Sequence, residues 1–142
     1  MLSSINPEPL TQNFILLTTF TLSMEYSMKL LESPYERISS GKKTIEIRLY
    51  DEKRQGLNIG DIIEFSKLPD LEDKVKVEIV ALLRYKSFKD LVNDFGMEYY
   101  GYPKDYSVED FVNSIYTIYS KEKEQQYGVL GIKIRLMNGA QD

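Results

Sequence analysis

The feature that most constrains the fold of this chain is the charged run from Gly41 to Arg54, GKKTIEIRLYDEKR. Three aliphatic residues recur within it at every second position: Ile45, Ile47 and Leu49. This spacing predicts a strand over residues 43–50 that buries one face. Glu46 and Arg48 lie on the other, displayed face, about 7 Å apart as same-face neighbours. They can therefore bind one small ligand together or form an exposed ion pair.

The absence of histidine and cysteine restricts the chemistry open to this chain. Its 142 residues suffice for one domain with its own core. No disulfide, thiol nucleophile, thiolate or imidazole metal site, or histidine base is possible. Any catalysis must use carboxylate, lysine, tyrosine, serine or threonine side chains. The sequence has no carboxylate cluster with metal-ligand spacing and no glycine-rich phosphate loop, so we expect no metal and no cofactor.

The charge distribution favours a local rather than a general anion-binding surface. The net charge of −4 argues against a broad basic coat of the kind that binds nucleic acids. The segment from Lys42 to Arg54 is nevertheless positive, with five basic residues against three acidic ones. Four of the eleven tyrosines lie in one predicted loop over residues 97–106, where Tyr102 could stack on a base.

Residues 1–23 differ from the rest of the chain and predict a poorly ordered extension. They contain no lysine or arginine, so they lack the positive region of a signal peptide and the arginines of a transit peptide. An extra edge strand over residues 14–22 is the alternative, and Met24 or Met28 is a candidate biological start. The expected organisation is an extension over residues 1–23, a domain over residues 24–138 and a tail over residues 139–142. We expect a cytoplasmic monomer with no membrane association.

Hydrophobic periodicity and turn residues predict the remaining elements. The predicted strands cover residues 25–31, 43–50, 62–65, 75–85 and 127–136. The predicted helices begin at serines, namely Ser33, Ser87 and Ser107, and the first two end at Gly41 and Gly96. Residues 121–126 are predicted as a polar connection. Short strands without regular helical crossovers predict an α+β fold, a small curved, mostly antiparallel β-barrel with about three flanking helices.

Finer patterns predict one helix cap and the buried faces of two of these elements. Ser33 and Glu36 have the spacing of a capping box at the start of the first helix. One face of the strand over residues 75–85 should be buried: Val75, Val77, Ile79, Ala81 and Leu83. The helix after Ser107 should bury one apolar stripe: Val108, Phe111, Val112, Ile115 and Ile118.

With these elements in this order, the run Gly41 to Arg48 resembles the ASCH family of the PUA-like superfamily. The resemblance extends from Met28 to about Leu136. Weaker matches lie around the central run: Met28-Lys29-Leu30, Pro34-Tyr35, Gly60-Asp61 and Tyr127-Gly128-Val129. It implies a small curved β-barrel whose cleft contains the Gly-Lys-Lys-Thr loop. It also implies binding of RNA or a modified nucleoside.

The same resemblance implies a possible enzymatic function. Some small bacterial members look like amidohydrolases that remove the acetyl group of N4-acetylcytidine, using a lysine, a threonine and a glutamate. Lys43 matches that lysine, whereas Glu46 stands at the position of the threonine. No glutamate falls in register near Lys104 and Asp105. Lys43 and Glu46 are the candidate catalytic residues if the cleft is catalytic.

Three functions remain open from the sequence. The first is binding of single-stranded RNA or of a modified nucleoside or nucleotide. Its candidate contact residues are Lys42, Thr44, Arg48, Lys53, Arg54 and Tyr102. The second is the amidohydrolase, with Lys43 as nucleophile or base. The third is a protein-interaction module that uses the acidic surface and the helix after Ser107.

Overall fold

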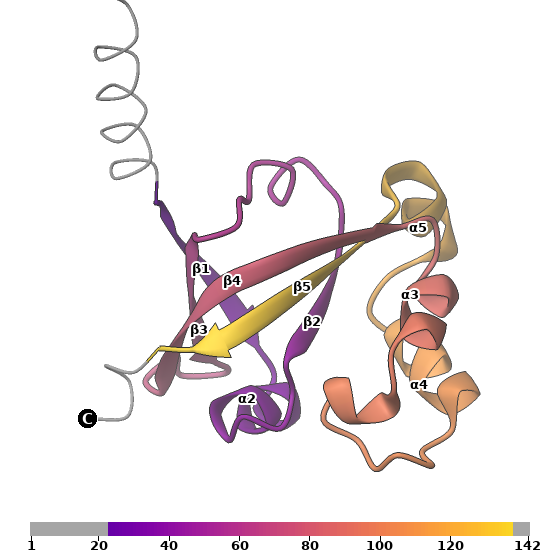
Figure 1. Cartoon of the computed structure of the whole chain (residues 1–142), viewed down its shortest axis with the longest axis horizontal. Helices are drawn as coiled ribbons and strands as arrows, with labels where there is room; N and C mark the ends of the chain where they lie inside the picture. The colour runs from indigo at the N-terminus through magenta and orange to yellow at the C-terminus, as the bar shows by residue number, and fades with distance from the viewer. Residues whose placement is uncertain (1–22, 138–142) are drawn as a thin grey trace, which may run out of the picture.

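A computed structural model describes residues 23–137, so the predicted extension lies almost wholly outside the described part and the tail lies outside it entirely. Five strands form one sheet in the order β1-β3-β4-β5-β2 (Figure 1). Their bounds are β1 (Glu25–Leu30), β2 (Ile45–Leu49), β3 (Ile62–Lys67), β4 (Lys74–Tyr85) and β5 (Val129–Leu136). β1 pairs with β3 in parallel, and the other three pairings are antiparallel. The sheet curls into a half-barrel, which confirms the predicted α+β class and PUA-like architecture.

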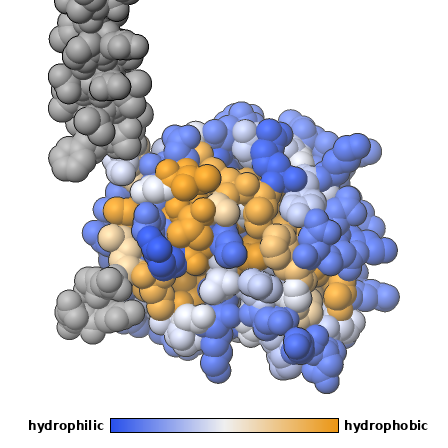
Figure 2. Space-filling model, in the orientation of Figure 1, coloured by the Kyte–Doolittle hydropathy of each residue, from blue (hydrophilic) through white to orange (hydrophobic). Residues whose placement is uncertain are grey.

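Four α-helices and one 3₁₀ turn flank this sheet within residues 23–137. Their bounds are α2 (Glu32–Ser39), α3 (Phe88–Asp94), η2 (Met97–Tyr99), α4 (Val108–Ile115) and α5 (Lys121–Tyr127). Helices α3, α4 and α5 gather at one end of the sheet, and α2 lies apart from them beside β2 (Figure 1). In the same orientation, Figure 2 shows apolar side chains over the middle of the sheet and polar ones over the helical end. None of these helices has the length and apolar character needed to cross a bilayer.

The core has two parts, one on each face of the sheet. The concave face packs against α2 through side chains such as Ile38, Phe65 and Ile132. The other part lies between β2 and the helices α3 and α4. Ile45, Ile47 and Leu49 are all buried there, as their spacing predicts, against residues that include Phe88, Leu91, Tyr100 and Phe111.

A bulge in β4 overturns the predicted burial of that strand's second half. The pairing with β5 shifts by one residue between Ile79 and Ala81. A single inserted residue exchanges the two faces of a strand. As a result Leu82 packs with the concave core, and Leu83 packs with the helical part. The prediction that Ala81 and Leu83 continue the stripe of Val75, Val77 and Ile79 is therefore wrong.

Two of the three predicted serine N-caps are present at the starts of their helices. The Ser87 and Ser107 hydroxyl oxygens accept hydrogen bonds of 3.1 Å from the amides of Asp90 and Asp110. Helix α2 instead begins at Glu32, with Leu31 as an N-cap that makes no side-chain bond.

The prediction of a capping box at Ser33 is therefore wrong. The Ser33 hydroxyl instead accepts a hydrogen bond from the Arg37 side chain. Gly41 follows α2 with a φ of +82°, a value suited to glycine, whereas Gly96 has a φ of −66° and lies after the extended residue Phe95.

Helix α4 ends earlier than its apolar stripe predicts. The Ser114 hydroxyl donates to the Phe111 carbonyl, and the Thr117 hydroxyl donates to the Ser114 carbonyl. Such side-chain bonds to the backbone compete with regular helix. The prediction that Ile118 is buried is wrong, since it lies past the helix end and is 66% exposed.

Helix α5 replaces the predicted polar connection. It has no apolar stripe, because its sequence is Lys-Glu-Lys-Glu-Gln-Gln-Tyr. The Ser120 hydroxyl caps it by accepting from the amide of Lys123. Its one buried side chain, Glu124, accepts bonds of 2.7 Å from the amide of Phe88 and the hydroxyl of Tyr116. A polar tertiary contact therefore fixes this helix against the start of α3.

Replacing Glu124 by alanine is expected to lower the free energy of unfolding by about 2 kcal/mol, because the buried amide of Phe88 loses its acceptor. Urea denaturation followed by circular dichroism measures the change. Glu122, exposed in the first turn of the same helix, is the matched control. Glu122→Ala should change stability by no more than about 0.5 kcal/mol. Equal losses in the two variants would contradict the capping role of Glu124.

Candidate ligand-binding cleft

The polar face of β2 is turned into the half-barrel. Glu46 pairs with Ile132 of β5, and Arg48 pairs with Leu130. Directly paired residues project from the same face of a sheet, so Glu46 and Arg48 share the concave side with two buried aliphatic residues. The prediction that this face is displayed to solvent is wrong: Glu46 is only 4% exposed. The curl of the sheet encloses a face that would be open in a flat one.

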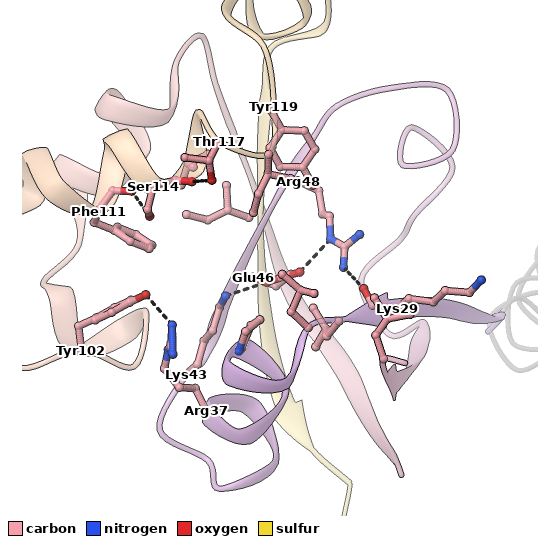
Figure 3. A pocket seen from close by; sticks show the side chains of 17 residues that line it. Lys29, Arg37, Lys43, Glu46, Arg48, Tyr102, Phe111, Ser114, Thr117 and Tyr119 are labelled. Carbon is pink, nitrogen blue, oxygen red and sulfur yellow. Dashed lines mark hydrogen bonds and ion pairs between the residues drawn. The ribbon is translucent and has the colours of Figure 1, made fainter. Parts of the chain in front are cut away.

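A cleft of about 380 Å³ opens where β1 and β2, the two edge strands, approach each other (Figure 3). Helix α2 borders it on one side, and α4 with the segment after it borders it on the other. Its principal polar and aromatic lining residues are Lys29, Arg37, Lys43, Glu46, Arg48, Tyr102, Phe111, Ser114, Thr117 and Tyr119. Four basic residues and one acidic residue line it, which gives the lining a formal charge of +3.

Lys43, Glu46 and Arg48 form a chain of ion pairs at the floor of the cleft. Lys43 Nζ lies 2.9 Å from Glu46 Oε1, and Arg48 Nε lies 2.8 Å from Glu46 Oε2. The side chains are 10%, 5% and 12% exposed, respectively. Arg48 Nη2 also donates a 3.1 Å bond to the carbonyl of Lys29, across the gap between β2 and β1. One buried carboxylate thus fixes the orientation of two cations.

Backbone contacts place Lys43 at this floor. Its amide donates a 2.8 Å bond to the carbonyl of Arg37 at the end of α2. An isolated β-bridge pairs Lys43 with Tyr100, a wholly buried tyrosine whose hydroxyl donates to the Leu91 carbonyl. The loop over residues 97–106 is therefore tied to the start of β2.

The two cations decide the protonation of Glu46. Burial alone would raise the pKa of its carboxyl group, because a low-dielectric environment disfavours the charged form. The charges and hydrogen bonds of Lys43 and Arg48 outweigh that effect and lower the pKa of Glu46 from 4.5 to about 2. Burial would lower the pKa of the Arg48 guanidinium, but the negative charge of Glu46 outweighs burial and raises this pKa overall. Glu46 and Arg48 are therefore both charged near neutral pH, and Glu46 is a weak base.

A guanidinium stacked on a tyrosine forms one wall of the cleft. The Arg37 guanidinium carbon lies 4.3 Å from the ring centroid of Tyr102, and Nη2 of Arg37 donates to the Tyr102 hydroxyl. Tyr102 packs in turn on Phe111, with ring centroids 5.0 Å apart. Gly101, with a φ of +85°, permits this contact, because a Cβ atom there would lie 2.6 Å from Arg37 Cδ.

Aliphatic side chains line the mouth. Leu31, which follows β1, is 59% exposed, and Ile118, which follows α4, is 66% exposed. Both line the cleft. Polar groups at the floor and apolar groups at the walls are a common arrangement in small-molecule sites.

The structure brings together some of the predicted site residues and separates others. Lys43, Glu46, Arg48 and Tyr102 all line this cleft. Lys53 and Arg54 line a neighbouring groove. Lys42 is exposed and Thr44 lines a separate hollow beside β4 and β5, so neither lies among the cleft residues.

Sequence reasoning did not include Arg37, Phe111 or Tyr119 as site residues. Arg37 lies in α2, about one turn before Gly41. No sequence pattern in this helix indicates that the Arg37 side chain faces the Gly-Lys-Lys-Thr loop. Phe111 and Tyr119 lie in or just beyond the apolar stripe of α4, which by pattern alone is a core stripe. Only the packing of α4 opposite β1 shows that they border a cleft.

Comparison with known proteins agrees with this architecture. The chain is similar to a crystal structure of hypothetical protein PH0355, with 38% identity, 80% of this chain and 100% of that chain covered, and a TM-score of 0.70. It is also similar to the solution structure of protein PF0455 from Pyrococcus furiosus, with 36% identity and a TM-score of 0.65. That match covers 81% of this chain and 99% of that chain. Among curated proteins no match was found.

An ASCH domain structure from Lactobacillus crispatus JV V101 shares the fold at 15% identity, with 95% of this chain and 87% of that chain covered and a TM-score of 0.55. The curled five-stranded half-barrel with four helices matches the ASCH/PUA-like fold. The family model of the ASCH domain matches residues 28–138. The chain belongs to the ASCH domain family.

Proposed function

We propose that the cleft binds a nucleotide, either free or within single-stranded RNA. The observation that carries this proposal is the pair of cations, Lys43 and Arg48, held on either side of buried Glu46 in a cleft whose mouth is aliphatic. Although the chain as a whole is acidic, the lining of this cleft is positive. Such a site attracts an anionic ligand and steers it to the floor.

Both cations retain hydrogen-bond donors for a ligand. An ammonium group has three N–H donors, and Lys43 Nζ pairs with one oxygen of Glu46. Arg48 uses Nε for Glu46 and Nη2 for the Lys29 carbonyl, and among residues 23–137 its Nη1 has no hydrogen-bond partner. Charged donors that are already held in place lose little conformational entropy when they bind a phosphate or a base carbonyl.

The walls suit a flat ring. Leu31 and Ile118 present exposed aliphatic side chains, and the planar Arg37 guanidinium, stacked on Tyr102, lines the same cleft. Unpaired bases of single-stranded RNA stack on arginine guanidinium planes as well as on aromatic side chains. A base between these walls would leave its phosphate or its carbonyl oxygens directed at Lys43 and Arg48.

The geometry gives less support to amide hydrolysis. A general base needs a pKa near the working pH, whereas Glu46 has a pKa of about 2 and is bonded to two cations. Among the residues that the structure places around the cleft, no other carboxylate is present. Lys104 and Asp105, where the resemblance to amidohydrolases would place a glutamate, are both exposed and do not line it.

Binding of a fluorescein-labelled, single-stranded RNA of five uridines, followed by anisotropy at low salt, tests the proposal. Arg48→Met is expected to weaken binding about tenfold or more, because a charge-assisted hydrogen bond is worth at least about 1.5 kcal/mol. Uridine monophosphate should compete for the wild-type cleft, and its affinity should fall in the same variant.

Arg135→Met is the matched control. Arg135 is an exposed arginine of β5 that does not line the cleft, so its replacement should leave RNA affinity within about twofold. A thermal melt of each variant verifies folding. Absence of RNA binding by the wild type, or equal affinities of the Arg48 and Arg135 variants, would rule out the proposed site.

A further inference from the structure

A second groove of about 520 Å³ begins at the cleft and runs along β1 toward the loop between β2 and β3. Its lining residues are Tyr26, Ser27, Met28, Lys29, Arg48, Lys53 and Arg54. Two of them, Lys29 and Arg48, also line the cleft, so the two hollows adjoin. Four of the seven lining residues are basic, and none is acidic.

Arg48 marks the junction between the two hollows. Its Nε contacts Glu46 at the cleft floor, and its Nη2 contacts the Lys29 carbonyl at the edge of β1. Figure 3 shows the Lys29 side chain extending beyond Arg48 and away from Glu46. The cations are thus arranged in series, from Lys43 in the cleft through Arg48 to Lys29 and then to the loop that carries Lys53.

The outer cations differ in how far they are neutralised. Arg54 Nη1 lies 3.2 Å from Asp51 Oδ2, so much of its charge is balanced within the loop. Neither Lys29 nor Lys53 forms an ion pair within the described part of the chain, and both are exposed. These two lysines are therefore the ones available to a second anionic group next to the cleft.

We infer that this groove carries the sugar-phosphate backbone of a single-stranded RNA onward from the cleft. The ligand is then a strand of at least two nucleotides rather than a free nucleoside, an inference that rests on the proposed function of the cleft. One phosphate contacts Lys43 and Arg48, and the next contacts Lys29 and Lys53. The half-buried ring of Tyr26, whose hydroxyl donates a 3.3 Å bond to the Gly56 carbonyl, offers a surface for a neighbouring base.

The test compares the five-uridine RNA with uridine monophosphate on the full chain, using Lys53→Glu. The variant should raise the dissociation constant of the RNA roughly fivefold, the upper range for one exposed ion pair. It should also reduce the slope of log K against log salt concentration by about 0.7, the contribution of one phosphate contact on a single strand. Affinity for uridine monophosphate should not change, because Lys53 does not line the cleft.

Lys89→Glu provides the same charge reversal at an exposed lysine of α3, outside both hollows. It should leave the salt slope of RNA binding unchanged. If the RNA binds no more tightly than uridine monophosphate, or if Lys53→Glu and Lys89→Glu have equal effects, the groove does not carry the strand although the cleft still binds a nucleotide. If neither probe binds the wild type, the proposed function of the cleft fails as well.

Discussion

Replacing Glu46 by alanine is expected to destabilise the folded chain by roughly 3–5 kcal/mol, the usual cost of removing one partner from a buried ion pair. The variant leaves the ammonium of Lys43 and the guanidinium of Arg48, only 10% and 12% exposed, without their shared counterion. Urea denaturation monitored by circular dichroism measures the loss. The midpoint of thermal unfolding should fall by roughly 10 °C or more.

Two further variants separate uncompensated charge from lost packing. Glu36→Ala removes an exposed carboxylate that lies 3.4 Å from Lys67, and it should cost less than about 1 kcal/mol. The triple variant Lys43→Met, Glu46→Leu, Arg48→Met replaces the whole ionic chain by apolar side chains, which is often neutral or stabilising. It should therefore be more stable than Glu46→Ala. Equal instability of the triple and single variants would show that buried charge is not the cause.

Acidification is expected to remove a comparable part of the stability. The Glu46 carboxyl has a pKa of about 2 in the folded chain and an ordinary value of 4.5, so the folded state releases this proton more readily than the unfolded state. The resulting stabilisation is complete above pH 4.5 and is lost as the pH falls through the folded-state pKa near 2. A shift of this size corresponds to about 3 kcal/mol.

The contribution of Glu46 can be isolated from that of other carboxylates by comparison with Glu46→Gln, which has no titrating group at this position. The free energy of unfolding is measured from pH 6 to pH 2 for both proteins. The advantage of the wild type should narrow by about 3 kcal/mol across this range. If the two curves stay parallel, the ion pairs to Lys43 and Arg48 do not hold Glu46 ionised.

Local sequence patterns sufficed for much of the fold. The period of two in Ile45, Ile47 and Leu49 predicted a buried strand face, and Ser87 and Ser107 predicted two helix starts. These features depend on neighbours within a few residues, where backbone geometry and capping chemistry act directly. Helix α5 could not be predicted in this way. It has no apolar stripe, and it is held by the hydrogen bond from the Phe88 amide on another helix to Glu124.

The sequence indicated only part of the cleft lining. Lys43, Glu46, Arg48 and Tyr102 line one cleft, but of the Gly-Lys-Lys-Thr loop that the ASCH resemblance implied in the cleft, only Lys43 lines it. Arg37 could not be recognised, because its role depends on stacking with Tyr102 from a distant loop. The β4 bulge after Ile79 was equally hidden, since a one-residue register shift is decided by pairing with β5.

The sequence alone determined that β2 has one apolar face and one charged face, and that its chemistry uses lysine, arginine and carboxylate without histidine or cysteine. It did not determine which face would be enclosed. A period of two defines two faces of a strand but carries no information on the curl of the sheet. Only the pairing of Glu46 with Ile132 and the approach of Arg48 to Lys29 decided that the charged face lies inside the half-barrel. Because water is largely excluded there, an ion pair expected at the surface becomes the buried floor of a cleft.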